Sequence, residues 1–174
     1  MKRLMRAAAA LAVMAAAVAI YAGVAAGHDG GGKGRHGNRG EHHGNKVLEQ
    51  NLAPSQPTDP QFHGVGPGGV PWVLNRGEAE LKMNGRFELR LDGLVIPTMG
   101  NTGPVTTVSA SLYCGPDSNT TAVDTTQSVP ISTNGDARIR DNSFTVPSTC
   151  LAPIVMVHPN GNAGAYIAIT GFRM

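Results

Sequence analysis

The stretch Glu78-Ala-Glu-Leu-Lys-Met-Asn-Gly-Arg-Phe-Glu-Leu-Arg-Leu91 decides the fold of this chain. On both sides of its central Asn-Gly, apolar side chains alternate with charged ones. The apolar members are Ala79, Leu81, Met83, Phe87, Leu89 and Leu91. Alternation with a period of two is typical of strands that bury one face. The stretch therefore predicts a β-hairpin that packs its apolar face into a core.

The turn of this hairpin follows from the burial of its faces. A two-residue turn would place Leu81 opposite Glu88 and mix apolar with charged side chains. A three-residue loop over residues 83–85 places Leu81 opposite Phe87 instead. It also puts Gly85 where a type I turn with a bulge requires a left-handed residue. We interpret the second Asn-Gly, residues 134–135, in the same way.

With residues 133–135 as the second loop, Ile131 faces Ala137 and Val129 faces Ile139. Other apolar runs are separated by Gly, Pro and Asn, and they predict strands over residues 70–75, 105–114, 143–146, 151–157 and 165–172. No segment shows a helical period, and the sum is about eight short strands.

This pattern predicts an all-β fold: a single antiparallel β-sandwich, jelly-roll-like or immunoglobulin-like, over residues 62–174. Trp72 precedes both cysteines, so the Cys–Trp–Cys order of an immunoglobulin domain is missing. We expect Trp72 to lie in the core.

Cys114 and Cys150 are the two cysteines of the chain. In an oxidising compartment an isolated pair within one domain is expected to form a disulfide. Cys114 also shares the apolar face of its predicted strand, so it points into the core. The alternative is a pair of metal-binding thiolates, for which no histidine partner stands at a suitable spacing.

The N-terminus predicts export. A basic start (residues 1–6) precedes the apolar run 7–20, and Val24-Ala25-Ala26 offers small residues to a signal peptidase. We expect a signal peptide over residues 1–26, cleaved after Ala26, and a secreted protein. The alternative is an uncleaved membrane anchor, since the apolar stretch approaches the length that spans a bilayer.

Residues 27–61 are rich in Gly, His and Pro, and predict a flexible linker between the signal and the domain. Residues 46–52 within it have the length of one or two helical turns. The chain has 14 Lys+Arg and 12 Asp+Glu; without Lys2, Arg3 and Arg6 of the signal the exported chain is nearly neutral. A neutral balance gives no support for nucleic-acid binding.

Three stretches resemble small secreted proteins of actinobacteria with a disulfide-linked β-domain: residues 104–114, 150–161 and 164–172. The resemblance covers roughly residues 62–174. It implies export and a disulfide-linked β-domain, and it brings no activity, cofactor or site residue to this chain.

Four histidines in the linker, His28, His36, His42 and His43, are candidate ligands for Cu²⁺, Ni²⁺ or Zn²⁺. A free amine at Gly27 beside His28 would complete a copper chelate. The opposing interpretation is a solvated linker in which the histidines have no biological role.

Within the domain, His158 is the remaining candidate, at the end of a predicted strand and before Pro159. We expect it to hydrogen-bond the turn rather than to catalyse; His63 is the weaker candidate. Catalytic motifs such as G-x-S-x-G, H-E-x-x-H and the P-loop do not occur. Asp117-Ser118-Asn119 lacks the spaced oxygen ligands of a calcium loop, and no helix is expected after the glycine-rich residues 64–69 to hold a phosphate.

The sequence thus favours a secreted, monomeric, non-enzymatic binding or structural module for an extracellular or cell-surface ligand. Its membrane contact would be the signal peptide during export. Two alternatives stay open: transition-metal binding through the histidine tail, and an enzyme whose site shows no known motif.

Overall fold

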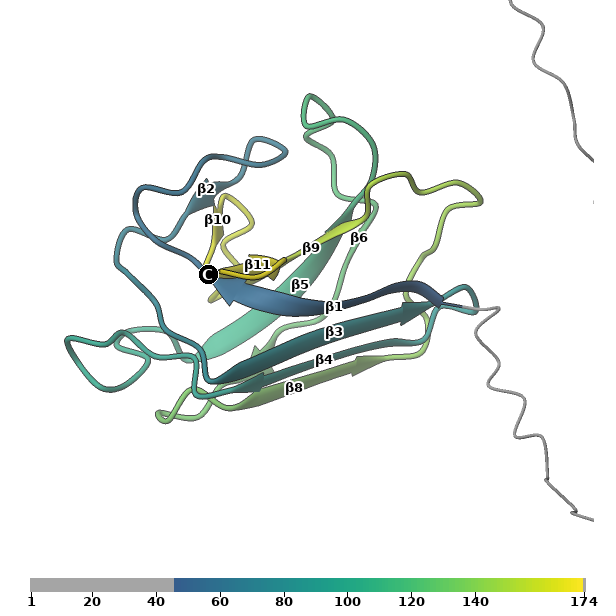
Figure 1. Ribbon diagram of the computed structural model, residues 1–174. Helices are drawn as coiled ribbons and strands as arrows, with labels where there is room; N and C mark the ends of the chain where they lie inside the picture. The colour runs from purple at the N-terminus through teal and green to yellow at the C-terminus, as the bar shows by residue number, and fades with distance from the viewer. Residues whose placement is uncertain (1–45, 174) are drawn as a thin grey trace, which may run out of the picture. The chain divides into compact units, whose positions relative to one another are not determined.

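The computed structural model describes residues 46–173, which form eleven strands and no helix. Figure 1 shows their arrangement. The strands are β1 (Lys46–Pro54), β2 (Gly66–Pro67), β3 (Arg76–Lys82), β4 (Phe87–Asp92), β5 (Thr107–Tyr113), β6 (Asp124–Thr125), β7 (Val129–Pro130), β8 (Ala137–Asp141), β9 (Ile154–Pro159), β10 (Ala165–Tyr166) and β11 (Ala168–Thr170).

Nine strands make one antiparallel sheet in the order β6-β5-β9-β11-β1-β3-β4-β8, with β7 also paired to β5. β1 joins its two halves, because residues 46–51 pair with β3 and residues 52–54 pair with β11. The sheet curls at β1, so that β5 and β9 face β3 and β4 across one core (Figure 1). The all-β, antiparallel prediction is confirmed, and β2 and β10 add a small parallel pair.

The first hairpin has the predicted register. Leu81 pairs with Phe87 and Ala79 with Leu89. Gly85 takes a φ of 80°, and a Cβ at this position would lie 2.6 Å from the carbonyl oxygen of Phe144. Both the left-handed conformation and the close approach of the backbone therefore require glycine.

The second hairpin prediction is right about the turn and wrong about the strands. Ser132 and Asp136 close the turn through backbone hydrogen bonds, and Gly135 has a φ of 85°. However, β7 pairs with β5, whereas β8 pairs with β4. The two strands separate after the turn because β7 pairs near one end of the strand order and β8 pairs at the other.

The core lies between the two halves of the sheet and contains the predicted apolar faces. Val108, Ala110 and Leu112 of β5 face it, as do the apolar residues of the first hairpin. Trp72 is buried there too, as expected. A second, smaller cluster on the other side of β5 consists of Val65, Tyr113, Met156 and Tyr166.

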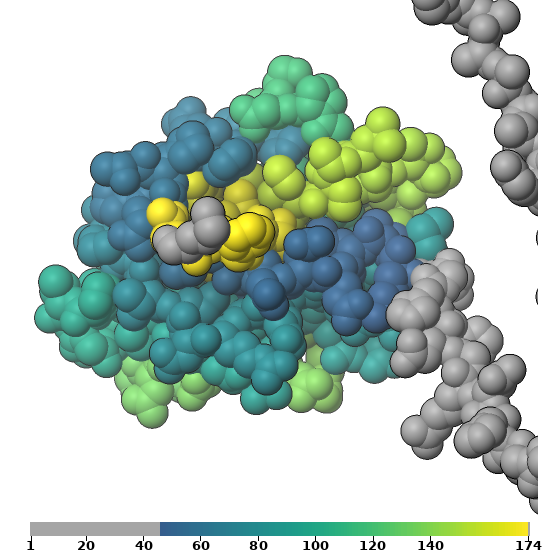
Figure 2. Space-filling model, in the orientation of Figure 1, coloured from purple at the N-terminus to yellow at the C-terminus, as the bar shows by residue number. Residues whose placement is uncertain are grey.

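Loops cover this second cluster, which explains why β5 is buried on both faces. The segment 55–72, the loop 114–123 and the C-terminal strands gather above β1 in the space-filling view (Figure 2). Tyr166 donates a hydrogen bond to the carbonyl of Pro60 at 2.8 Å. Burial raises the pKa of Tyr166 to about 12, so this hydroxyl stays protonated and keeps donating.

The predicted linker over residues 27–61 is wrong from residue 46 onward. Residues 46–54 form a strand rather than helical turns, and Leu48 and Leu52 are buried in the core. Residues 46–54 have few apolar side chains of their own. They form a strand because β3 and β11, which lie far along the chain, pair with them on either side. Residues 1–45, including the predicted signal peptide, lie outside the described residues.

Two smaller differences concern the loops, and one further strand prediction is confirmed. Residues 143–146 are not a strand; instead Phe144 inserts into the core and stacks on Phe87 with ring centroids 4.9 Å apart. Residues 70–75 contribute one isolated bridge, Val73 to Val95. The predicted strand 151–157 is β9, which is central as expected, between β5 and β11.

The predicted disulfide between Cys114 and Cys150 is present, with 5.1 Å between the Cα atoms. It ties the end of β5 to the segment that leads into β9. Gly115 donates a backbone hydrogen bond to Leu151 at 2.7 Å beside it. The disulfide therefore anchors residues 142–153, which have no regular structure of their own.

Candidate functional site

Charged side chains in the described residues concentrate on one half of the sheet. Seven of the eight Lys and Arg residues between 46 and 173 lie on β1, β3, β4 and β8 or in the first hairpin: Lys46, Arg76, Lys82, Arg86, Arg90, Arg138 and Arg140. Alternate residues of β3, β4 and β8 face the core, so the charged ones share the outer surface. On β1 a bulge between Lys46 and Leu48 shifts the register, and Lys46 forms an ion pair with Glu49 on the same surface. We call this surface the charged face.

The register arranges the charged face in rows that run across the strands. Glu49, Glu80 and Glu88 lie directly opposite one another on β1, β3 and β4. The next row contains Lys46 opposite Lys82 and Lys82 beside Arg86 across the hairpin turn. We call these the anionic row and the cationic row.

Ion pairs join the two rows along each strand. Glu80 pairs with Lys82 at 3.3 Å, and Lys46 pairs with Glu49 at 2.5 Å. Glu88 forms ion pairs with Arg86 at 2.5 Å and with Arg138 at 3.3 Å. Hydrogen bonding from Arg86, assisted by Arg138, lowers the pKa of the Glu88 carboxyl. Opposite charges thus meet along the strands, whereas equal charges lie opposite each other across β1, β3 and β4 in these two rows. At β8 the pattern changes, because Arg140 lies opposite Glu88.

Like charges directly opposite on neighbouring strands are unfavourable. Side chains of both rows keep between about a quarter and two thirds of their exposure, so water screens part of this repulsion. The arrangement departs from the pairing that would best stabilise the sheet itself. Such departures are expected at surfaces that serve a function.

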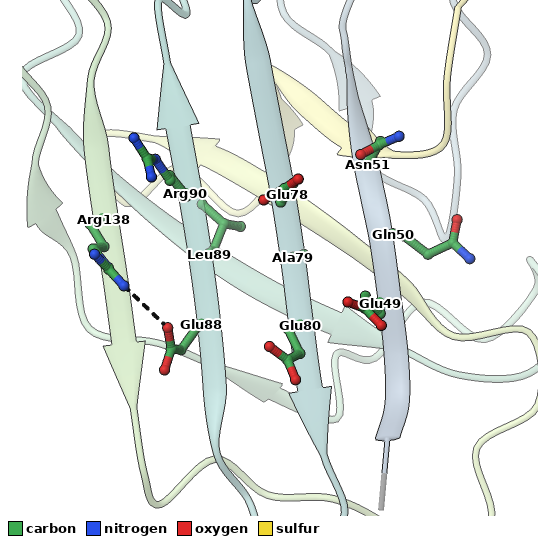
Figure 3. A pocket seen from close by; sticks show the side chains of 10 residues that line it. All are labelled: Glu49, Gln50, Asn51, Glu78, Ala79, Glu80, Glu88, Leu89, Arg90 and Arg138. Carbon is green, nitrogen blue, oxygen red and sulfur yellow. Dashed lines mark hydrogen bonds and ion pairs between the residues drawn. The ribbon is translucent and has the colours of Figure 1, made fainter. Parts of the chain in front are cut away.

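A depression of about 450 Å³ lies over the anionic row and the row behind it. Figure 3 shows Glu49, Glu80 and Glu88 aligned across three strands, with Asn51, Glu78, Arg90 and Arg138 in the row behind them. The surface therefore presents carboxylates and guanidinium groups on a rigid sheet. This arrangement can bind a polar partner that carries both charges.

His158 is completely buried on β9, where its side chain has a structural role. Its Nδ1 lies 2.8 Å from the carbonyl oxygen of Ala165, so that Nδ1–H donates across the turn between β9 and β10. Burial lowers the pKa of His158, which keeps the ring neutral. Ser109 lies opposite on β5, and both residues are buried.

His63, the weaker candidate, is also buried. Its backbone N–H donates to Asp117 at 2.5 Å, and its Nδ1 lies 2.8 Å from the carbonyl of Asn119. The ring stacks on Tyr113 with centroids 5.0 Å apart. Asp117 and Asn119 therefore hold the loop 114–123 on the domain.

His28, His36, His42 and His43 lie outside the described residues. Between residues 46 and 173 no group of three or more His, Cys, Asp and Glu side chains is arranged to hold a metal ion. The part of the chain that the structure describes contains no helix that could cross a membrane.

Comparison of the chain with protein-family models, with curated proteins and with solved structures finds no match. The sequence alone does not single out the charged face as a site, because Glu78, Glu80 and Glu88 stand near Arg and Lys as they do on an ordinary solvated sheet surface. The hairpin register already placed Glu80 opposite Glu88, and this was the signal that could have found it.

Proposed function

We propose that this chain is an exported, non-enzymatic binding or structural module that acts through the charged face. The row of three aligned carboxylates beside a row of three cations is the observation that carries the proposal. Both histidines of the described residues are buried with Nδ1 close to a backbone carbonyl, whereas the charged face is open to solvent.

Export and an actinobacterial source are part of the same proposal. The N-terminal pattern of residues 1–26 and the resemblance of residues 104–172 support them. A disulfide between Cys114 and Cys150 is compatible with an oxidising extracellular setting.

The nearly balanced charge suggests a ligand that carries both signs. A polymer with ammonium and carboxylate groups in each repeat, such as the peptide-bearing polymer of a bacterial cell wall, has this chemistry. A polyanion would meet the anionic row, and a polycation would meet the cationic row.

The test is retention of the exported chain on insoluble peptidoglycan at low salt, with the double variant Arg90→Ala/Arg138→Ala as the comparison. Both arginines are exposed, so this variant is expected to fold. We expect retention of the original chain, a loss of at least about tenfold in the variant, and no retention on heparin or chitin. Equal retention of both proteins, or none of either, would contradict the proposal.

Metal binding through His28, His36, His42 and His43 stays the second proposal, supported by the composition of residues 27–45. The enzyme alternative receives no support from the described residues, since His158 is enclosed.

A further inference from the structure

We infer that the charged face pairs with the same face of a second copy of this chain. The inference rests on the proposed function, because it gives the surface assigned above a second partner, which competes with the polymer for it. It starts from the two rows, which are parallel to each other and opposite in sign.

The symmetry of the rows makes the surface complementary to itself. A two-fold axis that lies in the charged face, along the boundary between the rows, turns a second copy over to face the first. This rotation exchanges the positions of the rows. The anionic row of each copy then lies over the cationic row of the other, as an isologous interface requires.

Pairing also relieves the repulsion within each row. In one copy Glu80 lies between Glu49 and Glu88, and its nearest cation, Lys82, is on its own strand. In the pair, each carboxylate gains a cation from the facing copy. The exposed ion pairs along the strands are individually weak and can rearrange to accept it.

The contact is expected to be weak and sensitive to salt. It involves a few strands near the hairpin and mostly charged side chains, which places it at the small, polar end of interfaces. Screening shortens the reach of these charges from about 30 Å at ~0.01 M salt to about 3 Å at ~1 M salt. At low salt this inference therefore predicts the mass of a dimer, whereas the sequence predicts the mass of a monomer.

The test is sedimentation of the exported chain and of two reciprocal variants. Glu80→Lys/Glu88→Lys gives both rows a net positive charge, and Lys82→Glu/Arg86→Glu gives both rows a net negative charge, while Glu49 and Lys46 stay unchanged. We expect the original chain to form dimers at low salt, with at least a tenfold weaker association at high salt. Each variant alone is expected to stay monomeric, whereas an equimolar mixture forms a heterodimer.

The variant Glu80→Gln/Glu88→Gln removes two negative charges with little change in side-chain size, and circular dichroism shows whether each protein is folded. This neutral variant should associate at least tenfold more weakly than the original chain. A monomeric original chain at low salt, or folded reciprocal variants that stay monomeric when mixed, would overturn the inference. Retention on peptidoglycan without self-association would overturn it while leaving the proposed function intact.

Discussion

Replacing Gly135 by alanine should destabilise the domain strongly, and the structure allows the magnitude to be worked out. Gly135 has a φ of 85°, which costs an L-residue about 1–2 kcal/mol. A Cβ here would also lie 2.3 Å from the nitrogen and 2.4 Å from the oxygen of Leu94. These atoms belong to backbone, so the turn itself must move.

Movement of the turn breaks a backbone hydrogen bond at the edge of the core. Leu94 is completely buried and donates its N–H to the carbonyl of Gly135 at 3.0 Å. Leaving a buried N–H without a partner costs about 1–3 kcal/mol. We therefore expect Gly135→Ala to lower the free energy of unfolding by about 2–5 kcal/mol in total.

Gly115→Ala is the matched control. Gly115 has a φ of 91°, and a Cβ there meets no heavy atom within 4 Å. It should lose only the conformational part, about 1–2 kcal/mol. Urea unfolding with the disulfide intact, followed by the fluorescence of Trp72, measures both variants. A difference between them below about 0.5 kcal/mol would refute the steric argument.

Three further predictions concern the disulfide, the buried histidine and the tail. Because Cys114 and Cys150 are 36 positions apart, reduction should lower the free energy of unfolding by about 4 kcal/mol on the chain-entropy model. A loss below about 1 kcal/mol in urea unfolding would contradict that role. The lowered pKa of His158 means that the unfolded chain binds its proton first, so His158 favours folding fully above pH ~6.5 and loses this contribution as the pH falls through the unfolded pKa towards the folded one. Unfolding of His158→Gln between pH ~7.5 and ~5 should show a weaker pH dependence, and an unchanged slope would argue against this assignment. If the histidine tail binds copper, calorimetry should find tight Cu²⁺ binding that disappears when residues 27–45 are removed; binding that survives the deletion would place the metal elsewhere.

Part of the candidate site could be read from the sequence. The three-residue turn at residues 83–85 fixes Glu80 opposite Glu88 and Lys82 beside Arg86, so two members of each row follow from local pattern alone. Glu49 and Lys46 could not be added in this way. They belong to β1, whose alignment with β3 depends on a contact across about thirty residues of chain.

The sequence by itself determined the first hairpin with its buried face and the apolar strands β5 and β9, because alternation and turn chemistry act between neighbouring residues. The disulfide followed from the presence of two cysteines in the chain. Tertiary structure alone decided that residues 46–54 join the sheet, that β7 leaves β8 for β5, and that His63 is enclosed. Each of these depends on which distant strand or loop offers a backbone edge and an apolar surface. That choice is made by the curl of the whole sheet, which no local pattern specifies.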